Sequence, residues 1–274
     1  MHARSAVFDL YGDHLAERGG WAPIAAVVRL LAAVDVAAPA VRTAVSRLSR
    51  EDWLEPQERD GVRGYATTPR AQRRLRSAWD RIYRTAPAPW DGSWHVVVVE
   101  HVADRSRRDR ITASLGYLGY ARMATDTWVG PRRSDELDTA LEGQRTRSFS
   151  GRLDGDGAAL ARDLWDLRGL SRAYDGFLRS AERLTGRVDD LVRQPEEAFA
   201  VRTTLVHEWR KFLFDDPGLP PEVLPDDWAG HAAAERFDEL TRALRPAASA
   251  YVDACLVGDP DTVQQTPAAL QSSD

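Results

Sequence analysis

Residues 24–68 read IAAVVRLLAAVDVAAPAVRTAVSRLSREDWLEPQERDGVRGYATT, and this stretch decides the fold of the N-terminal part of the chain. Apolar residues recur at helical spacing from Ile24 to Val34, which predicts one amphipathic helix. The chain then turns, and Pro39 stands where a second helix would begin. Two short helices joined by such a turn predict a helix-turn-helix.

The second helix, predicted over residues 39–50, has two chemically different faces. Its inner face carries Val41, Ala44, Val45 and Leu48. Its outer face carries Arg42, Thr43, Ser46, Arg47 and Arg50. Arginine, serine and threonine opposite an apolar face suit a helix that lies in a DNA major groove. The alternative is an ordinary amphipathic helix with a solvated basic face.

The residues after this helix favour DNA binding over that alternative. Two short strands are predicted over residues 53–56 and 65–68, around a turn-rich tip at residues 59–64. This order is typical of a winged helix, in which basic residues of the wing reach phosphates or the minor groove. We therefore expect base contacts from Arg42, Thr43, Ser46 and Arg47, and mainly phosphate contacts from Arg50, Arg59 and Arg63.

Charge is spread unevenly along the 274 residues, a length that allows two or three small domains. The net charge of −5 argues weakly against nucleic-acid binding. Residues 1–90, however, hold 14 arginines and 10 acidic residues, a net charge of +4, which leaves −9 for the remainder. This asymmetry suits a DNA-reading domain joined to a separate body for sensing or dimerising.

Other features bound the class of protein. The only cysteine, Cys255, excludes an intramolecular disulfide and fits a reducing cytoplasm. No apolar stretch approaches the ~20 residues of a membrane span, and the N-terminus lacks the apolar core of a signal peptide. The six histidines are scattered. We expect a cytoplasmic protein with no membrane partner, no cofactor, no metal site and no catalytic residues.

Beyond the winged helix, the pattern predicts a multidomain α+β protein. A strand over residues 94–99, a helix over 106–118 and two later strands predict a ferredoxin-like unit. From Gly157 the pattern is helical. We predict a winged-helix domain over residues 1–86, a ferredoxin-like domain over 90–155 and a helical domain over 156–260. Further helices are predicted at 5–18, 69–85, 198–214 and 232–256, a domain boundary at Pro87-Ala88-Pro89, and a frayed tail after Pro260.

Three stretches carry a resemblance to a known family. Residues 40–48 read AVRTAVSRL, and the middle segment contains GY at 119–120 and WVGP at 128–131. The most specific run is LVHEWRKFL at 205–213, continued by DDPGLPP at 215–221. With these motifs the chain resembles the PaaX family, bacterial repressors of phenylacetic-acid catabolism genes, over about residues 5–256.

The resemblance implies an N-terminal winged helix, a Cas2-like middle domain and a helical C-terminal domain, assembled as a homodimer on double-stranded operator DNA. It also implies release from DNA by an aryl-CoA thioester, typically phenylacetyl-CoA. For this effector we expect Trp209, Arg210 and Lys211 to contribute, because they join cations to an aromatic ring in the most distinctive run. We expect the dimer interface in the C-terminal helices, which can bury a long apolar stripe.

Two alternatives stay open at this point. A metal-dependent nuclease centred on the middle domain would need carboxylates at the end of the first strand, where Glu100 and Asp104 lie. The sequence there departs from the family's pattern, and neither residue lies in a recognisable ligand motif. His207 and Arg210 share a helical face, which suits either a ligand or domain contact or an internal salt bridge.

Overall fold

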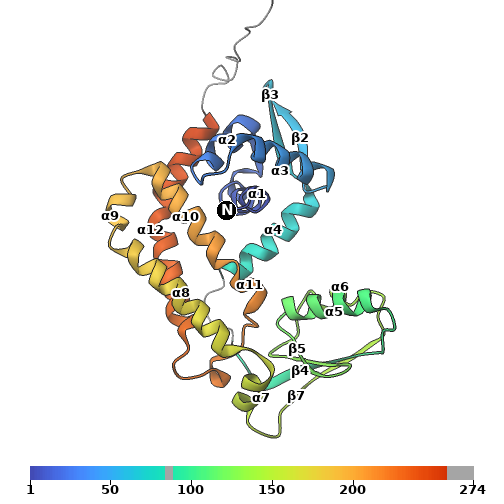
Figure 1. Ribbon diagram of the computed structural model, residues 1–274. Helices are drawn as coiled ribbons and strands as arrows, with labels where there is room; N and C mark the ends of the chain where they lie inside the picture. Colours follow the sequence, from blue (N-terminus) through green and yellow to red (C-terminus); the bar gives the residue numbers. More distant parts are fainter. Residues whose placement is uncertain (84–88, 258–274) are drawn as a thin grey trace, which may run out of the picture. The chain divides into compact units, whose positions relative to one another are not determined.

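The computed structural model describes residues 1–83 and 89–257, and its internal contacts divide the chain into two units (Figure 1). Unit 1 consists of Met1–Asp80, Gly186–His207 and Leu240–Asp274, and unit 2 of Arg81–Thr185 and Glu208–Glu239. Of the predicted boundary, Pro87 and Ala88 lie outside the described residues, as do the predicted end of the helix at Thr85 and the predicted tail after Pro260.

Unit 1 begins with the predicted helix-turn-helix and wing. Its elements are α1 (Ala3–Asp9), η1 (Leu10–His14), η2 (Ala16–Arg18), β1 (Trp21–Pro23), α2 (Ile24–Ala32), α3 (Ala38–Arg50), β2 (Leu54–Arg59), β3 (Val62–Thr67) and α4 (Pro69–Ile82). The two predicted helices are confirmed as α2 and α3, with Pro39 in the first turn of α3. That position suits proline because its missing N–H has no partner in a first helical turn.

The wing is longer than predicted and belongs to a three-stranded sheet of order β1-β3-β2. Arg59 pairs with Val62, so only Asp60 and Gly61 form the turn. Both turn residues have positive φ, at 51° and 77°, as a two-residue hairpin turn requires. The predicted tip at residues 59–64 is therefore wrong in length, and the sequence reading missed strand β1.

The single helix predicted over residues 5–18 is also wrong, because the segment changes its helical type twice. After α1 the backbone widens into the π-helix η1, in which the Leu15 N–H donates to the Leu10 carbonyl at 3.0 Å. The 3₁₀-helix η2 follows, and Gly19 ends it in the left-handed conformation. A π-helical turn holds one residue more than an α-helical turn and shifts the register of the side chains that follow.

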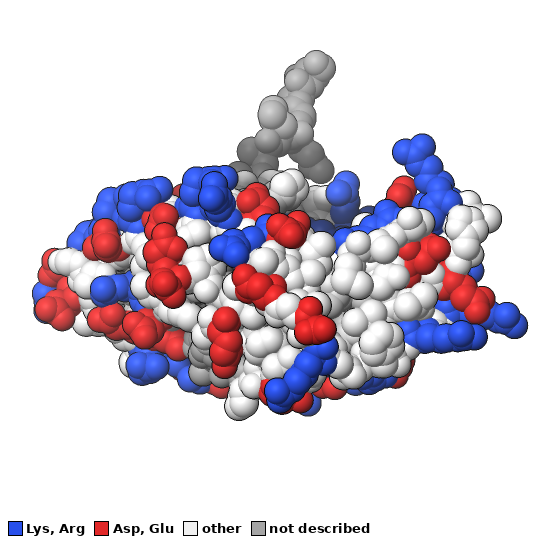
Figure 2. Space-filling view, turned by 90° about the horizontal axis from the view of Figure 1, so that it is seen from below, with Lys and Arg blue, Asp and Glu red and all other residues white. Residues whose placement is uncertain are grey.

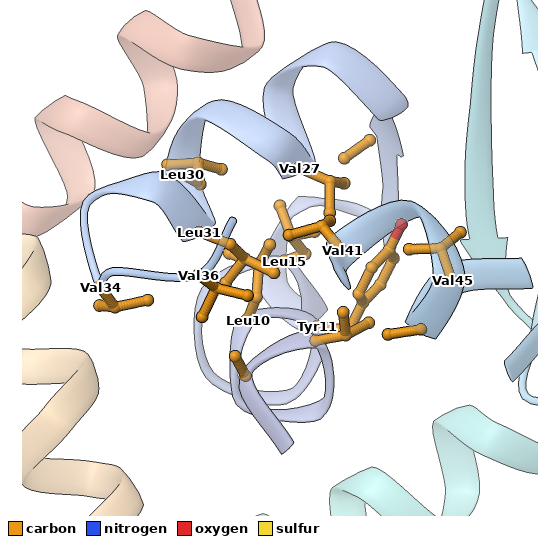
Figure 3. Packing of buried hydrophobic residues seen from close by; sticks show 14 of the residues in the cluster. Leu10, Tyr11, Leu15, Val27, Leu30, Leu31, Val34, Val36, Val41 and Val45 are labelled. Carbon is orange, nitrogen blue, oxygen red and sulfur yellow. The ribbon is translucent and has the colours of Figure 1, made fainter. Parts of the chain in front are cut away.

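One apolar core joins these elements (Figure 3). Side chains of η1, α2 and α3 point toward one another there, among them Leu10, Tyr11, Leu30, Leu31 and Val41. Three later elements of unit 1 are α9 (Val188–Leu191), α10 (Pro195–Trp209) and the second half of α12 (Ala229–Val257). Helices α10 and α12 add Phe199, Val252 and Cys255 to the same buried cluster. The winged helix thus shares its core with C-terminal helices.

Unit 2 contains the predicted ferredoxin-like fold. Its elements are β4 (Ser93–Val99), α5 (Arg105–Tyr117), β5 (Ala121–Ala124), β6 (Thr127–Gly130), α6 (Leu137–Ala140), β7 (Thr146–Arg152), α7 (Gly157–Leu164), α8 (Leu167–Thr185), α11 (Phe212–Asp215), η3 (Pro221–Val223) and the first half of α12. The order βαββαβ is that of the ferredoxin-like motif. All strand pairs are antiparallel, in the order β5-β6-β4-β7.

The sheet of unit 2 buries apolar side chains on both faces. On one face Val97, Val99 and Trp128 lie with Ile111 and Leu115 of α5. The other face buries Trp94 and Val129 in a cluster with residues of α7, α8 and η3. Along the described part of the chain, no helix combines the length and apolarity that crossing a bilayer requires.

Candidate nucleic-acid interface

Helix α3 presents its predicted polar face to solvent. Val41, Val45 and Leu48 are at most 1 % exposed and fix the helix against the core. The five residues predicted for DNA contact on this helix are all exposed: Arg42, Thr43, Ser46, Arg47 and Arg50. The structure therefore brings these five side chains together on one outward surface of unit 1.

The side chains of this surface differ in how firmly they are held. The Thr43 hydroxyl donates to the Pro39 carbonyl at 2.8 Å, and Arg50 Nε lies 3.5 Å from the Ser46 carbonyl. Arg42 makes no side-chain hydrogen bond or ion pair with any residue of the described part of the chain. Its guanidinium is free to donate two parallel hydrogen bonds, the geometry with which arginine recognises guanine.

A positive field surrounds the C-terminal end of α3. Glu51 caps that end and forms an ion pair with Arg4 at 2.7 Å. The hydrogen bond from Arg4 lowers the pKa of Glu51, and the charges of Arg4, Arg50 and Arg47 lower it further. This carboxylate therefore stays ionised. Because arginines surround it, the net charge around this end of α3 stays positive.

The wing arginine Arg59 is supported by a strand that the sequence reading missed. Its guanidinium lies 4.9 Å from the ring centroid of Trp21 in β1, a cation–π distance, and Nη2 donates to Gln57 Oε1 at 3.1 Å. Arg63 is exposed on the paired strand. The glycine pair at residues 19 and 20, just ahead of Trp21, is the signal that could have revealed β1.

Two contacts fix the wing, one to the helical segment η1 and one to strand β1. The Tyr11 hydroxyl donates to the Tyr65 carbonyl at 3.1 Å, and burial raises the pKa of this phenol well above its usual value. Gly64 permits the close approach of β1, since a Cβ there would lie 2.8 Å from the Trp21 ring. Such a contact is too short for a real Cβ atom. The wing is thus set in position by a phenol, a glycine and an indole ring.

More arginines extend the basic character of unit 1 along α4. Arg70, Arg73, Arg74 and Arg76 are all exposed, and the Arg74 guanidinium lies 5.8 Å from the ring centroid of Trp53. Elsewhere the charges are mixed, as Figure 2 shows for one face, where acidic and basic side chains are interspersed. The local clustering on α3, α4 and the wing therefore identifies the candidate interface better than net charge does.

Family models confirm the resemblance over three consecutive segments. The PaaX-like protein model matches residues 2–70, the central Cas2-like domain of PaaX protein matches 87–151, and the PaaX-like C-terminal domain matches 165–254. This chain belongs to the PaaX-like family. All seven residues predicted for DNA contact lie within the PaaX-like segment 2–70.

Two individual relatives match most of this PaaX-like chain. The protein named Transcriptional repressor PaaX from Escherichia coli is 28 % identical over 263 residues, which is 90 % of this chain and 82 % of that protein. The solved structure of uncharacterized protein Rv0674 from Mycobacterium tuberculosis matches with a TM-score of 0.58 and 24 % identity. It covers 92 % of this chain and 98 % of that one, and this likeness supports the fold alone.

A buried polar network joins the winged helix of the PaaX-like chain to α10. Asp13 accepts hydrogen bonds from both terminal nitrogens of Arg202, one of them at 3.0 Å, and both side chains are less than 10 % exposed. His14 Nε2 lies 2.9 Å from Thr203 Oγ1, and burial lowers the pKa of His14 to about 4. Asp9 Oδ2 lies 2.7 Å from His207 Nδ1, a pairing within the chain that also links two of the predicted domains.

A polar cavity of about 290 Å³ opens beside this network. It is lined by Asp13, His14, Glu17, Arg18, Arg202, Arg245 and Ser249. Arg245 pairs with Glu17, and Arg18 pairs with Asp253 at 2.7 Å. Each arginine of the lining therefore already has a carboxylate partner.

The three residues predicted for the effector lie in different surroundings. Trp209 is buried, stacks on Phe237 at 4.7 Å between ring centroids, and donates from Nε1 to the Ile82 carbonyl at 3.0 Å. Arg210 is half-buried, whereas Lys211 is exposed and paired with Glu208. The structure does not join the three into one cation-plus-aromatic surface, and their role stays a prediction.

The carboxylates considered for a nuclease centre also have structural partners. Asp104 caps α5 and accepts from the Ser106 N–H at 2.8 Å. Glu100 is exposed, 3.8 Å from Arg145. In residues 1–83 and 89–257, no group of three or more histidine, cysteine, aspartate or glutamate side chains is placed to hold a metal ion. Nothing in this geometry favours the nuclease reading.

Proposed function

We propose that this PaaX-like protein is a sequence-specific transcriptional repressor that binds double-stranded operator DNA and has no enzymatic activity. The observation that supports it most is the exposed polar face of α3 beside a wing whose arginine is held on Trp21. In this arrangement Arg42, Thr43, Ser46 and Arg47 contact base edges, while Arg50, Arg59 and Arg63 contact mainly phosphates. A relative named as a repressor supports the same function. Such a protein acts in the cytoplasm.

Binding to the DNA upstream of the protein's own gene tests this function. In fluorescence anisotropy, replacement of Arg42 or Arg47 by alanine should each weaken specific binding by about 1–3 kcal/mol and relax specificity at one base pair. Arg193→Ala is a matched control, because it removes an exposed arginine directly after α9, and α9 lies away from α3 in Figure 1. The proposal would be overturned if wild type bound the upstream DNA no more tightly than random DNA and the Arg42→Ala, Arg47→Ala double variant bound both equally well.

We further propose that the protein acts as a homodimer, because one winged helix offers too small a contact for useful specificity. A two-fold dimer reads two half-sites, which is the common solution among helix-turn-helix proteins.

The effector that we propose is an acyl-CoA thioester such as phenylacetyl-CoA, on the basis of the family resemblance. A ligand releases DNA only when it binds one conformation better than the other. Thermal shift with phenylacetyl-CoA, free phenylacetate and CoA separates the thioester from its parts. Arg210→Ala and Lys211→Ala test the predicted residues better than a change at Trp209, which lies in the core. If no thioester raises the melting temperature or releases DNA, the effector proposal fails and the repressor proposal stands.

A further inference from the structure

Strand β7 forms a free edge of the unit 2 sheet. Among the described residues it pairs only with β4, in continuous register from Ser93↔Arg152 to Val99↔Thr146. Every residue of β7 is exposed except Gly151, which is half-buried. The strand contains neither a proline nor a bulge, two of the devices by which proteins protect such edges. Its outer backbone groups are therefore ready to pair with another strand.

An exposed aromatic side chain lies at the middle of this strand. Phe149 is 60 % exposed, and it lies beside Val96 and Val98 on the same face of the sheet. Val98 is itself 37 % exposed. A large apolar side chain on an open edge strand favours association with another chain.

The direction of the backbone groups in β7 is suited to pairing. The Glu100 N–H donates to the Arg145 carbonyl at 2.9 Å, which makes these two residues a hydrogen-bonded pair of the ladder. Because backbone groups alternate in direction along a strand, Ser148 and Ser150 direct theirs to the open edge. Phe149 then occupies a position without outer hydrogen bonds, where opposing side chains approach most closely.

The sequence of β7 is complementary to itself about Phe149. In an antiparallel pair centred there, Phe149 faces Phe149 of the second copy and Ser148 faces Ser150. Arg147 then faces Gly151, and Thr146 faces Arg152. No like charges are opposed, whereas centring the pair on Arg147 would place two guanidinium groups opposite each other, which destabilises a sheet. The charges therefore favour the register centred on Phe149 over the one centred on Arg147.

The C-terminal helices expose less apolar surface for a dimer interface than the sequence suggested. The apolar stripe expected at a dimer interface is buried within the chain, since Phe199, Phe237, Leu240, Leu244 and Val252 are at most 1 % exposed. The predicted interface stays untested, but the side chains that motivated it already have neighbours. By contrast, no residue of the described part of the chain covers Phe149, which is 60 % exposed.

We propose that β7 pairs antiparallel with β7 of a second copy of this chain, centred on Phe149, and so joins two four-stranded sheets into one. This pairing assigns an interface to the homodimer proposed above. Only its role in DNA binding rests on the proposed function, because the mass of the dimer can be measured without DNA. Two seven-residue strands bury less than the ~800 Å² per partner of a standard interface, so we expect dissociation on the order of micromolar concentration.

Opposite charges introduced at position 149 test both the surface and its symmetry. In sedimentation velocity across a concentration series, wild type should form a dimer, and Phe149→Arg and Phe149→Glu should each be monomeric at the same concentrations. An equimolar mixture of the two variants should recover the dimer, because residue 149 faces its own copy. The side chain is exposed, so each variant should melt close to the wild-type temperature.

The opposite edge of the sheet supplies the control. Met123 on β5 is 45 % exposed, and Met123→Arg should leave the dimer intact. A monomeric wild type, a Phe149→Arg variant that stays dimeric, or a mixture of the charge variants that stays monomeric would each overturn the proposal. Failure of the DNA assays with an intact β7 dimer would instead contradict the repressor function alone.

Discussion

At the residue scale, the ion pairs that hold distant segments of the chain together differ in burial. Asp13 and Arg202 are separated by 189 positions, yet they form a buried ion pair that joins η1 to α10. The exposed pair Arg245–Glu17 joins α12 to η2 at the surface. Burial decides how much each pair contributes to stability. Exposed ion pairs contribute little, whereas removing one partner of a buried pair is strongly destabilising.

Replacement of Arg202 should therefore be costly. Arg202→Met leaves the Asp13 carboxylate buried without its counterion and should destabilise the protein by about 3–5 kcal/mol in denaturant unfolding. The double variant Asp13→Asn, Arg202→Met should recover most of this loss, because asparagine keeps an acceptor for the Trp79 indole N–H. Arg245→Met is the control, and its loss should be at most about 1 kcal/mol. Similar losses for both single variants would contradict this ranking.

His14 should make stability depend on acidity. Its folded-state pKa of about 4 lies below the usual 6.5, so as pH falls the unfolded chain takes up the proton first. The free energy of unfolding is therefore highest above pH 6.5 and decreases by about 3 kcal/mol as pH falls from 6.5 toward 4. His14→Gln should flatten the pH dependence of the unfolding free energy in this window. An unchanged slope in the variant would contradict a buried neutral imidazole.

At the element scale, the sequence predicted those parts whose pattern is local. The outer face of α3 follows from helical periodicity alone, and its buried residues agree with that prediction. Strand β1 was missed because three residues are too short for a pattern, and it is a strand only because β3 pairs with it. The Asp13–Arg202 pair was equally invisible, since periodicity gives no information about partners 189 positions apart.

The contact between β1 and the wing depends on the small size of Gly64. Gly64→Ala places a Cβ against the Trp21 ring and the Ala22 carbonyl, which must move apart. We expect a loss of about 1–3 kcal/mol in stability and weaker DNA binding, because Arg59 rests on the displaced ring. Gly116→Ala in α5 is the control: nothing lies within 4 Å of its Cβ, and it should stabilise by about 0.5–1 kcal/mol.

At the scale of the whole molecule, the order of winged helix, Cas2-like unit and C-terminal helices was predicted, and the family models agree with it. The internal contacts, however, divide the C-terminal helices between two units, with α12 contributing to both. Sequence could not reveal this division, because an amphipathic helix shows which face is buried but not against which segment. The predicted domain boundaries stay predictions.

The proposed assembly makes a prediction for operator binding. A dimer should bind a two-half-site operator far more tightly than a single half-site, because the second contact is intramolecular. Phe149→Arg should lose most of that gain while binding an isolated half-site as the wild type does. Electrophoretic mobility shift with one-site and two-site DNA measures both quantities. If the variant retained the full two-site gain, β7 would not be the surface that joins the copies.

The π-helix η1 also bears on how related sequences should be aligned. A π-helical turn is equivalent to a one-residue insertion in an α-helix. It is marked here by the hydrogen bond from the Leu15 N–H to the Leu10 carbonyl. Removing one residue between Leu10 and His14 would let a regular α-helix form, and every later side chain would turn by about 100°. Asp13 and His14 would then lose Arg202 and Thr203. Homologues with a one-residue gap at this point should therefore also lack the arginine at the position of Arg202.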